Sequence, residues 1–232
     1  MSWVIVVLGF CVLIILHELG HFTAAKAVGM RVEKFSLFFP PTLWKVKKGE
    51  TEYAIGAIPA GGYVRITGMN PSEDLPEEVR DRAYHAQPVW KRMVVIAAGP
   101  FVNFVLAFVL LLVFYSLLGP HEVTGKIDTV QKGYPAFGKL HPGDKVVSND
   151  AADAVFLFAV ISLSLAIINL FPFLPLDGGH IFWAAVEFVR RRPVPYTVME
   201  RAGVLGFMLV IGLFLLGLTN DIDRLTSGTG VR

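Results

Sequence analysis

Two histidines and a glutamate stand close together near the end of the first apolar run, in the stretch "ILHELGHFTAA" of residues 15–25. His17 and His21 are four residues apart, so on a helix they lie about 40° from each other on one face, with Glu18 beside them. Two imidazole nitrogens on consecutive turns can hold a metal ion, and a neighbouring carboxylate can take a proton from water that the metal activates. The spacing therefore predicts a hydrolytic metal site, in which the small Gly20 leaves room for a second backbone.

A catalytic zinc ion usually has three protein ligands and keeps one position for water, so the chain must supply a third ligand. The strongest candidate is Asp177 in "NLFPFLPLDGGH", residues 169–180, where Pro172 and Pro175 prevent a regular helix. Aspartate is also a favoured helix cap, and taken alone the two roles are evenly balanced. Asn169 in the same stretch either donates to a substrate carbonyl or ties the unwound backbone.

The competing interpretation of the two histidines is a buried pair that neighbouring carbonyls satisfy, with Glu18 reaching the membrane surface. An ionised side chain at bilayer depth costs about 2.5–3.5 kcal/mol even on lenient insertion scales, which favours a functional role for a glutamate there. His85 and His180 are further candidates for the third ligand. His121 and His141 are excluded, because the charge distribution places their loop on the other side of the membrane.

The composition is that of a membrane protein. Of 232 residues, 54% are hydrophobic and 17% charged, the mean hydropathy is +0.57, and the formal net charge of +2 gives no reason to invoke nucleic acid. The single cysteine, Cys11, excludes a disulfide framework and a cysteine metal cluster. Four apolar runs have about the length that a helix needs to cross a bilayer. They are Trp3 to about Ala25, Met93–Leu118, Ala154–Phe171 and Ala202–Leu218.

These runs predict an α-helical membrane protein of about four transmembrane helices, with a small membrane-associated β-hairpin or sheet after the first helix and a truncated PDZ-like outer loop. The first run lacks a basic leader and a small-residue cleavage site, so it is interpreted as a permanent helix. The expected segments are helix 1 with the His-Glu-x-x-His motif at 1–29, a cytoplasmic-side hairpin and connector at 30–92, helix 2 at 93–118, a periplasmic-side loop at 119–153, helix 3 with the Leu-Asp-Gly motif at 154–177, a cytoplasmic-side helix and loop at 178–201, helix 4 at 202–218, and a tail at 219–232.

The distribution of lysine and arginine between the connections predicts the orientation. Loop 119–153 has four such residues, Lys126, Lys132, Lys139 and Lys145. Loop 30–92 has ten, namely Arg31, Lys34, Lys45, Lys47, Lys48, Arg65, Arg80, Arg82, Lys91 and Arg92. The loop with ten is therefore expected to be cytoplasmic, which places both termini on the periplasmic side and the metal site toward the cytoplasm.

Two motifs together resemble a known family. "HELGH" and "PLDGG" resemble the site-2 family of intramembrane zinc metalloproteases, and the order of spans, the Gly-rich hairpin, "AAGPFVNF" and the PDZ-like "PAFGKL" and "PGDKVV" are similar to bacterial regulator-of-sigma-E proteases. The resemblance implies one zinc ion per chain, held by His17, His21 and Asp177, with Glu18 as general base. Asn169 is similar to a polar residue that precedes the family's aspartate motif. The residues that match the second-span motif are Gly99, Pro100 and Asn103.

The resemblance implies a zinc metalloendopeptidase of the bacterial inner membrane that acts in regulated intramembrane proteolysis. Its substrates would be single-span membrane proteins, such as a membrane-anchored anti-sigma factor, and remnant signal peptides. A metal-binding transporter is one alternative, but it has no role for Glu18 and would ordinarily show internal repeats. A catalytically inactive membrane scaffold is another, and the intact metal motif argues against it.

The hairpin sequence "TEYAIGAIPAGGYVRITG", residues 51–68, predicts short strands and tight turns. A membrane helix must unwind before its peptide bonds can be attacked, and its freed backbone groups then need partners. An edge strand within 53–66 is expected to supply them by strand addition, although the hairpin could instead only brace the fold. The expected substrate contacts are Gly61, Gly62, Tyr63 and Val64.

Overall fold

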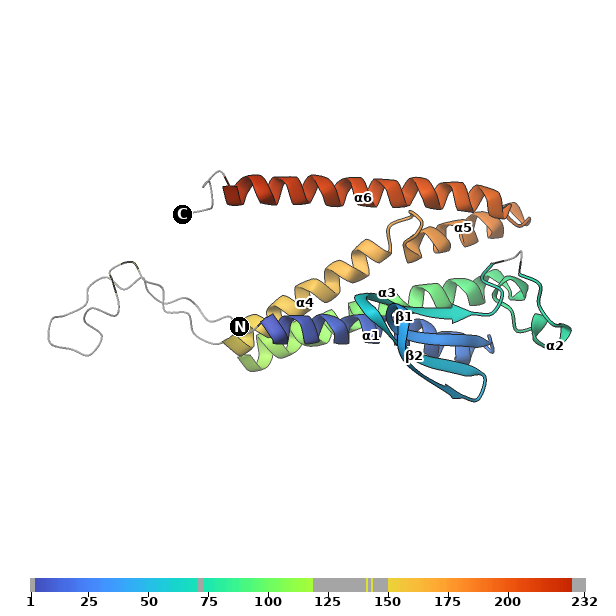
Figure 1. Ribbon diagram of the computed structural model, residues 1–232, viewed down its shortest axis with the longest axis horizontal. Coiled ribbons are helices and arrows are strands. Elements are labelled where there is room, and N and C mark those ends of the chain that lie inside the picture. The colour runs from blue at the N-terminus through green and yellow to red at the C-terminus, as the bar shows by residue number, and fades with distance from the viewer. Residues whose placement is uncertain (1–2, 71–72, 119–140, 142, 144–149, 227–232) are drawn as a thin grey trace.

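The computed structural model describes residues 3–70, 73–118, 141, 143 and 150–226 of the chain. A long helix opens it, a β-hairpin follows, and the rest is helical (Figure 1). The helices are α1 (Trp3–Ala27), α2 (Glu77–Arg80), α3 (Val89–Val113), α4 (Asp150–Asn169), α5 (Asp177–Arg190) and α6 (Tyr196–Thr226), with the 3-10 turn η1 (Tyr84–Ala86) and the π-helical turn η2 (Phe114–Leu118). The strands are β1 (Val32–Lys48) and β2 (Thr51–Ile66).

Four helices in the described part of the chain are long and apolar enough to cross a membrane, as the composition predicts. The candidate spans are Val4–Ala27, Val89–Leu118, Ala151–Asn169 and Thr197–Asp223. Large apolar side chains on these helices face outward, for example Phe101 at 64% exposure and Leu213 at 62%. Such exposure is unfavourable in water and matches a lipid environment. The chain is therefore an integral membrane protein.

The helix bounds differ from the predicted segments in three places. Helix α3 begins at Val89 rather than at residue 93, because Pro88 precedes its first turn and the polar start of the helix lies before the apolar run. Helix α6 is likewise longer than the expected 202–218. The segment expected at 154–177 begins earlier, at Asp150, and is broken before Asp177 as Pro172 and Pro175 predict: α4 ends at Asn169, and Asp177 begins the separate helix α5.

The sheet consists of β1 and β2, and both strands bend strongly. Residues 34–37 of β1 pair with two parts of β2, 52–55 and 62–65, while residues 44–48 also pair with 51–55. The segment 62–65 therefore lies at an edge, with residues 34–37 on one side and no further pairing in the part of the chain that the structure describes. The prediction of a small sheet after the first helix is confirmed.

The hairpin is joined to the helices by a compact apolar core at one end of α1. That core contains Ala25, Met30, Val32, Ile66, Tyr84, Val95 and Ile96. This core thus joins the end of α1, the start of β1, the end of β2, η1 and the first half of α3. Because all seven core residues are buried and packed together, they hold the sheet in a defined position beside α1.

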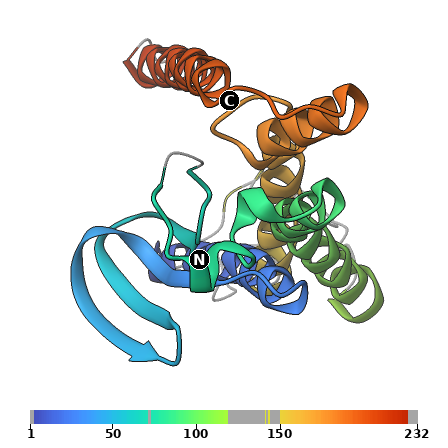
Figure 2. The ribbon, with the colours of Figure 1, turned by 90° about the vertical axis from the view of Figure 1, so that its right-hand side faces the viewer.

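Helices α1, α3 and α4 form one group, and α5 lies against α3 (Figures 1 and 2). Helix α6 lies apart from that group, on the far side of α5. Its close approach to the rest is at Gly206, where an added Cβ would lie 1.8 Å from the Leu174 carbonyl oxygen. The PDZ-like loop 119–153 lies almost entirely outside the described residues.

Candidate active site

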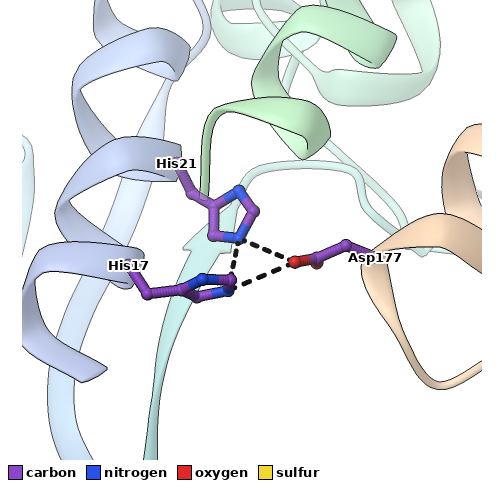
Figure 3. Close-up of side chains that lie close together, drawn as sticks. All are labelled: His17, His21 and Asp177. Carbon is purple, nitrogen blue, oxygen red and sulfur yellow. Dashed lines mark hydrogen bonds and ion pairs between the residues drawn. The ribbon is translucent and has the colours of Figure 1, made fainter. Parts of the chain in front are cut away.

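His17, His21 and Asp177 converge, although 156 residues separate the last two in the sequence (Figure 3). The two Nε2 atoms are 3.2 Å apart. Oδ2 of Asp177 lies 3.2 Å from Nε2 of His17 and 3.3 Å from Nε2 of His21. The three ligand atoms are all within 4.8 Å of one another, and both histidines are buried. The structure thus brings the three expected metal ligands to one point.

Two different elements position these side chains. His17 and His21 stand on consecutive turns of α1, and Asp177 is the first residue of α5, after the turns that replace the end of the third span. The residue that precedes α5 is Leu176, and no side chain caps the helix there. Asp177 therefore does not act as an N-terminal cap, and its carboxylate is directed toward the histidines instead.

Glu18 and the expected substrate contacts line the same cavity as the three ligands. The cavity has a volume of about 580 Å³. Its wall includes every residue that the sequence assigns to the site: His17, Glu18, His21, Gly61, Gly62, Tyr63, Val64, Asn169 and Asp177. Within it, Nδ2 of Asn169 lies 3.4 Å from Nε2 of His17, so the asparagine side chain reaches the metal ligands rather than only the local backbone.

The remaining histidines occupy different places. His85 lies in η1, where its Nδ1 is 3.0 Å from the carbonyl oxygen of Gly68. His180 lines the cavity one turn after Asp177 on α5 but does not belong to the cluster of three ligands. His141 is exposed, and His121 lies outside the described residues.

Two glycines allow helices to approach closely at the site. A Cβ added to Gly20 would lie 2.6 Å from the carbonyl oxygen of Ala98, which confirms that this glycine leaves room for a second backbone. A Cβ added to Gly99 would lie 2.3 Å from Nε2 of His21 and 2.9 Å from Cε1 of His17. The sequence analysis gives Gly99 only as a match to the second-span motif, and in the structure this glycine makes room for the imidazole rings.

The residues present fit a divalent metal ion. Oδ2 of Asp177 is buried and makes no hydrogen bond, despite its short distance from both histidines. The outer nitrogen of His21, Nδ1, lies 2.8 Å from the carbonyl oxygen of Val95 and can donate to it, which leaves Nε2 free to bind a metal. Two imidazoles and one carboxylate, converging with room for another ligand, are the donor set of a catalytic zinc site.

Comparison with known proteins agrees with this site. Residues 5–213 match the sequence pattern of Peptidase family M50. The chain belongs to this family. The expected resemblance is thereby confirmed at the level of the family.

Several curated proteins are similar to this chain. Zinc metalloprotease Rip1 of Mycobacterium tuberculosis (strain ATCC 25618 / H37Rv) is 43% identical over 108 residues, which cover 47% of this chain and 27% of that protein. A putative zinc metalloprotease of Chlamydia trachomatis serovar D is 41% identical over 64% of this chain and 24% of its own length. The matched segments thus span about a quarter of these relatives. A putative zinc metalloprotease of Nostoc sp. is 24% identical and matches over 93% of this chain and 94% of its own length.

The solved structure of the site-2 protease from Methanocaldococcus jannaschii is similar in fold. The TM-score is 0.50 at 22% sequence identity, and the match covers 95% of this chain and 70% of that one. The helical membrane fold predicted from the sequence is therefore similar to a fold that has been solved.

Proposed function

We propose that this member of the family is an intramembrane zinc metalloendopeptidase that hydrolyses peptide bonds in or near the transmembrane segments of single-span membrane proteins. The observation that carries the proposal is the convergence of His17, His21 and Asp177 beside Glu18 in one cavity. Membership of a peptidase family and the zinc metalloproteases among the relatives support it.

The position of the histidines along α1 supports chemistry inside the bilayer. His21 and His17 lie six and ten residues before the end of the helix at Ala27. At 1.5 Å per residue these positions are about 9 and 15 Å along the axis from that end. Both therefore fall within the apolar span Val4–Ala27 rather than at its border.

One zinc ion per chain would be held by Nε2 of His17, Nε2 of His21 and the carboxylate of Asp177. When bound, zinc supplies a Lewis acid that polarises the substrate carbonyl and makes water nucleophilic at neutral pH. Glu18, one residue after the first ligand, takes a proton from the attacking water and returns it to the leaving amine. The amide of Asn169 donates to the substrate carbonyl and holds it beside the ligands.

The substrate backbone would be held by the sheet edge. Residues Gly62–Arg65 pair with Leu37–Lys34 on one side and with no other strand in the described part of the chain. The same edge lines the cavity through Gly61, Gly62, Tyr63 and Val64. An unwound substrate segment could add to this edge as a further strand, which satisfies its freed N–H and C=O groups. The absence of a side chain at Gly62 is needed there, because a Cβ would lie 2.9 Å from Cγ of Glu18.

Proline substitutions at Tyr63 and Val64 test strand addition. Successive N–H groups of a strand point to opposite sides, so one of the two substitutions removes a bond to β1 and the other removes a donor to the substrate. We expect one variant that is fully folded and cleaves poorly. Two folded variants with unchanged cleavage would rule out pairing at this edge.

The expected location and substrates belong to the same proposal. The lysine and arginine distribution supports a multi-pass protein of the bacterial inner membrane, with its termini on the periplasmic side and the active site toward the cytoplasm. The substrates we propose, by family resemblance, are a membrane-anchored anti-sigma factor and remnant signal peptides. The lipid bilayer is the surrounding medium of the reaction.

Cleavage of a tagged single-span protein by the purified chain in detergent tests the function. Zinc is quantified in the wild type and in Glu18→Gln. We expect the wild type to cut and the variant to hold zinc without cutting, a result that neither a metal transporter nor an inactive scaffold would give. Zinc-loaded wild type that cuts none of a panel of single-span substrates, or a variant that cuts as fast as the wild type, would refute the proposal.

A further inference from the structure

Asn103 of α3 is a fully buried polar residue beside the metal ligands. It is 0% exposed, and its Nδ2 lies 3.2 Å from Nδ1 of His17. Its other side-chain atom, Oδ1, is buried and makes no hydrogen bond. The hydroxyl of Ser162 on α4 donates to the backbone carbonyl of Asn103 over 2.8 Å, so α4 packs against α3 at this residue without touching its side-chain amide.

The direction of the His17 ring limits what Asn103 can do. Nε2 of His17 faces Nε2 of His21 and Oδ2 of Asp177, so the ring offers Nε2 to a metal and directs Nδ1 toward Asn103. An imidazole that binds a metal through one nitrogen carries its proton on the other, and that N–H needs an acceptor. His21 has such an acceptor in the carbonyl of Val95, 2.8 Å from its Nδ1.

The corresponding acceptor for His17 has to come from the Asn103 side chain. An amide nitrogen cannot accept a hydrogen bond, but a half-turn of the amide exchanges Nδ2 for Oδ1 at nearly the same place. Because Oδ1 has no hydrogen-bond partner among the described residues, this rotation gives up no hydrogen bond of Oδ1.

We propose that Asn103 accepts a hydrogen bond from the Nδ1–H of His17 through its Oδ1 and is thereby a positioning residue of the metal site. It selects the tautomer in which Nε2 of His17 is free to bind the metal and holds the ring plane toward Asp177. The inference rests on the ligand set of the proposed function. It assigns Asn103 a role beyond helix packing, for which a leucine of similar size would serve equally well.

Zinc affinity distinguishes positioning from packing. We would measure it by chelator competition on the full chain in detergent, for the wild type, Asn103→Leu, Asn103→Asp and the packing control Ser162→Ala. Loss of a hydrogen-bond acceptor behind a ligating histidine typically weakens metal binding about 10- to 100-fold. We expect that loss in Asn103→Leu and near wild-type affinity in Asn103→Asp, which keeps an acceptor oxygen, and in Ser162→Ala. A folded Asn103→Leu variant with wild-type affinity would overturn the inference.

A second measurement needs no variant of Asn103, so it applies even if the leucine variant does not fold. In zinc-loaded wild type labelled with ¹⁵N-histidine, the His17 signals are assigned by their loss in His17→Gln. We expect a protonated, hydrogen-bonded Nδ1 and a zinc-bound Nε2, and zinc on Nδ1 would contradict the assignment. If the wild type binds no zinc, or Asp177→Asn binds it as well as the wild type does, the proposed ligand set itself is wrong, an outcome distinct from unchanged affinity in Asn103→Leu.

Discussion

Arg92 of α3 and Glu187 of α5 form a partly buried ion pair, with 2.6 Å between Nη2 and Oε2 and exposed side-chain fractions of 16% and 12%. The other carboxylate oxygen of Glu187 accepts from the backbone N–H of Val194 over 3.0 Å. One carboxylate thus ties α5, which begins with Asp177, both to α3 and to the segment that leads into α6. The pair lies ten residues from Asp177, the proposed metal ligand, on a continuous helix, so it orients that helix against the proposed ligands on α1.

Removing one member of this pair is expected to destabilise the protein. Glu187→Gln leaves the mostly enclosed guanidinium of Arg92 without its counter-ion, which we expect to cost about 1–3 kcal/mol. Chemical unfolding in detergent measures the effect. The matched control is Lys45→Gln, which breaks an exposed contact of 3.5 Å to Glu52 and should leave the free energy of unfolding nearly unchanged. Equal effects of the two changes would contradict the structural role given to Arg92 and Glu187.

A methyl group at Gly99 is expected to abolish metal binding. In Gly99→Ala the new Cβ would clash with Nε2 of His21, the atom proposed to bind the metal, so the ring must move away. We expect zinc in the purified protein to fall well below one per chain. Gly212→Ala on α6 is the control, because no atom lies within 4 Å of its added Cβ, and it should keep its zinc. Full zinc occupancy in Gly99→Ala would show that the ring position is wrong.

Metal removal and loss of a ligand should have the same consequence. We expect cleavage to stop when zinc is removed by a chelator and to return when zinc is added back. Asp177→Asn should weaken zinc binding by about 100-fold or more, since even the loss of a partner behind a ligand costs 10- to 100-fold. Competition with a chelator measures both effects. An Asp177→Asn variant that retains wild-type affinity would point to a different third ligand, and His180, which also lines the cavity, would be tested next.

Stability should depend on pH through Glu50 in the turn between the two strands. Hydrogen bonds from Arg82 and Lys26, with 2.8 Å from Arg82 Nη1 and 2.5 Å from Lys26 Nζ, lower the pKa of Glu50 from 4.5 to about 2. Because the pKa is lowered on folding, the stabilisation is present in full above about pH 4.5 and is lost as the pH falls toward 2.

The variant Glu50→Gln isolates this effect. We expect it to be less stable than the wild type by about 1 kcal/mol at pH 7, the range of partly exposed ion pairs, and equally stable near pH 2. Thermal unfolding at several pH values measures the difference. A difference that stayed constant from pH 7 to pH 2 would mean that the charge of Glu50 is not its cause.

The sequence predicts which residues of the candidate site come together better than it predicts the bounds of the surrounding elements. The His-Glu-x-x-His spacing places three groups on one helix face from helical geometry alone, and broken backbone before Asp177 identifies the segment that can reach them. His17, His21 and Asp177 come together as the sequence predicts. The helix bounds are less predictable, because polar residues such as those at the start of α3 extend a helix beyond the apolar run from which its ends are estimated.

The sheet register and the contacts of Asn103 could not be predicted. Residues 34–37 pair with two parts of β2 because that strand turns back between residues 55 and 62, and hydropathy carries no signal for such a turn. Asn103 lies in an apolar span as one polar residue among many packing residues, and only the three-dimensional structure places it at His17.

The close approach of Gly62 to Glu18 has a consequence for how a cleavage site would be chosen. A substrate strand paired along Gly62–Arg65 would be held in a register that its backbone hydrogen bonds set. Glu18, the proposed general base, lies beside Gly62 and therefore at one fixed position of that register. The bond presented to the nucleophile would then be determined by counting residues from the start of pairing, with little regard to which side chains flank it. Substrates unrelated in sequence could thus be cut at the same depth, provided that each can be drawn out into a strand.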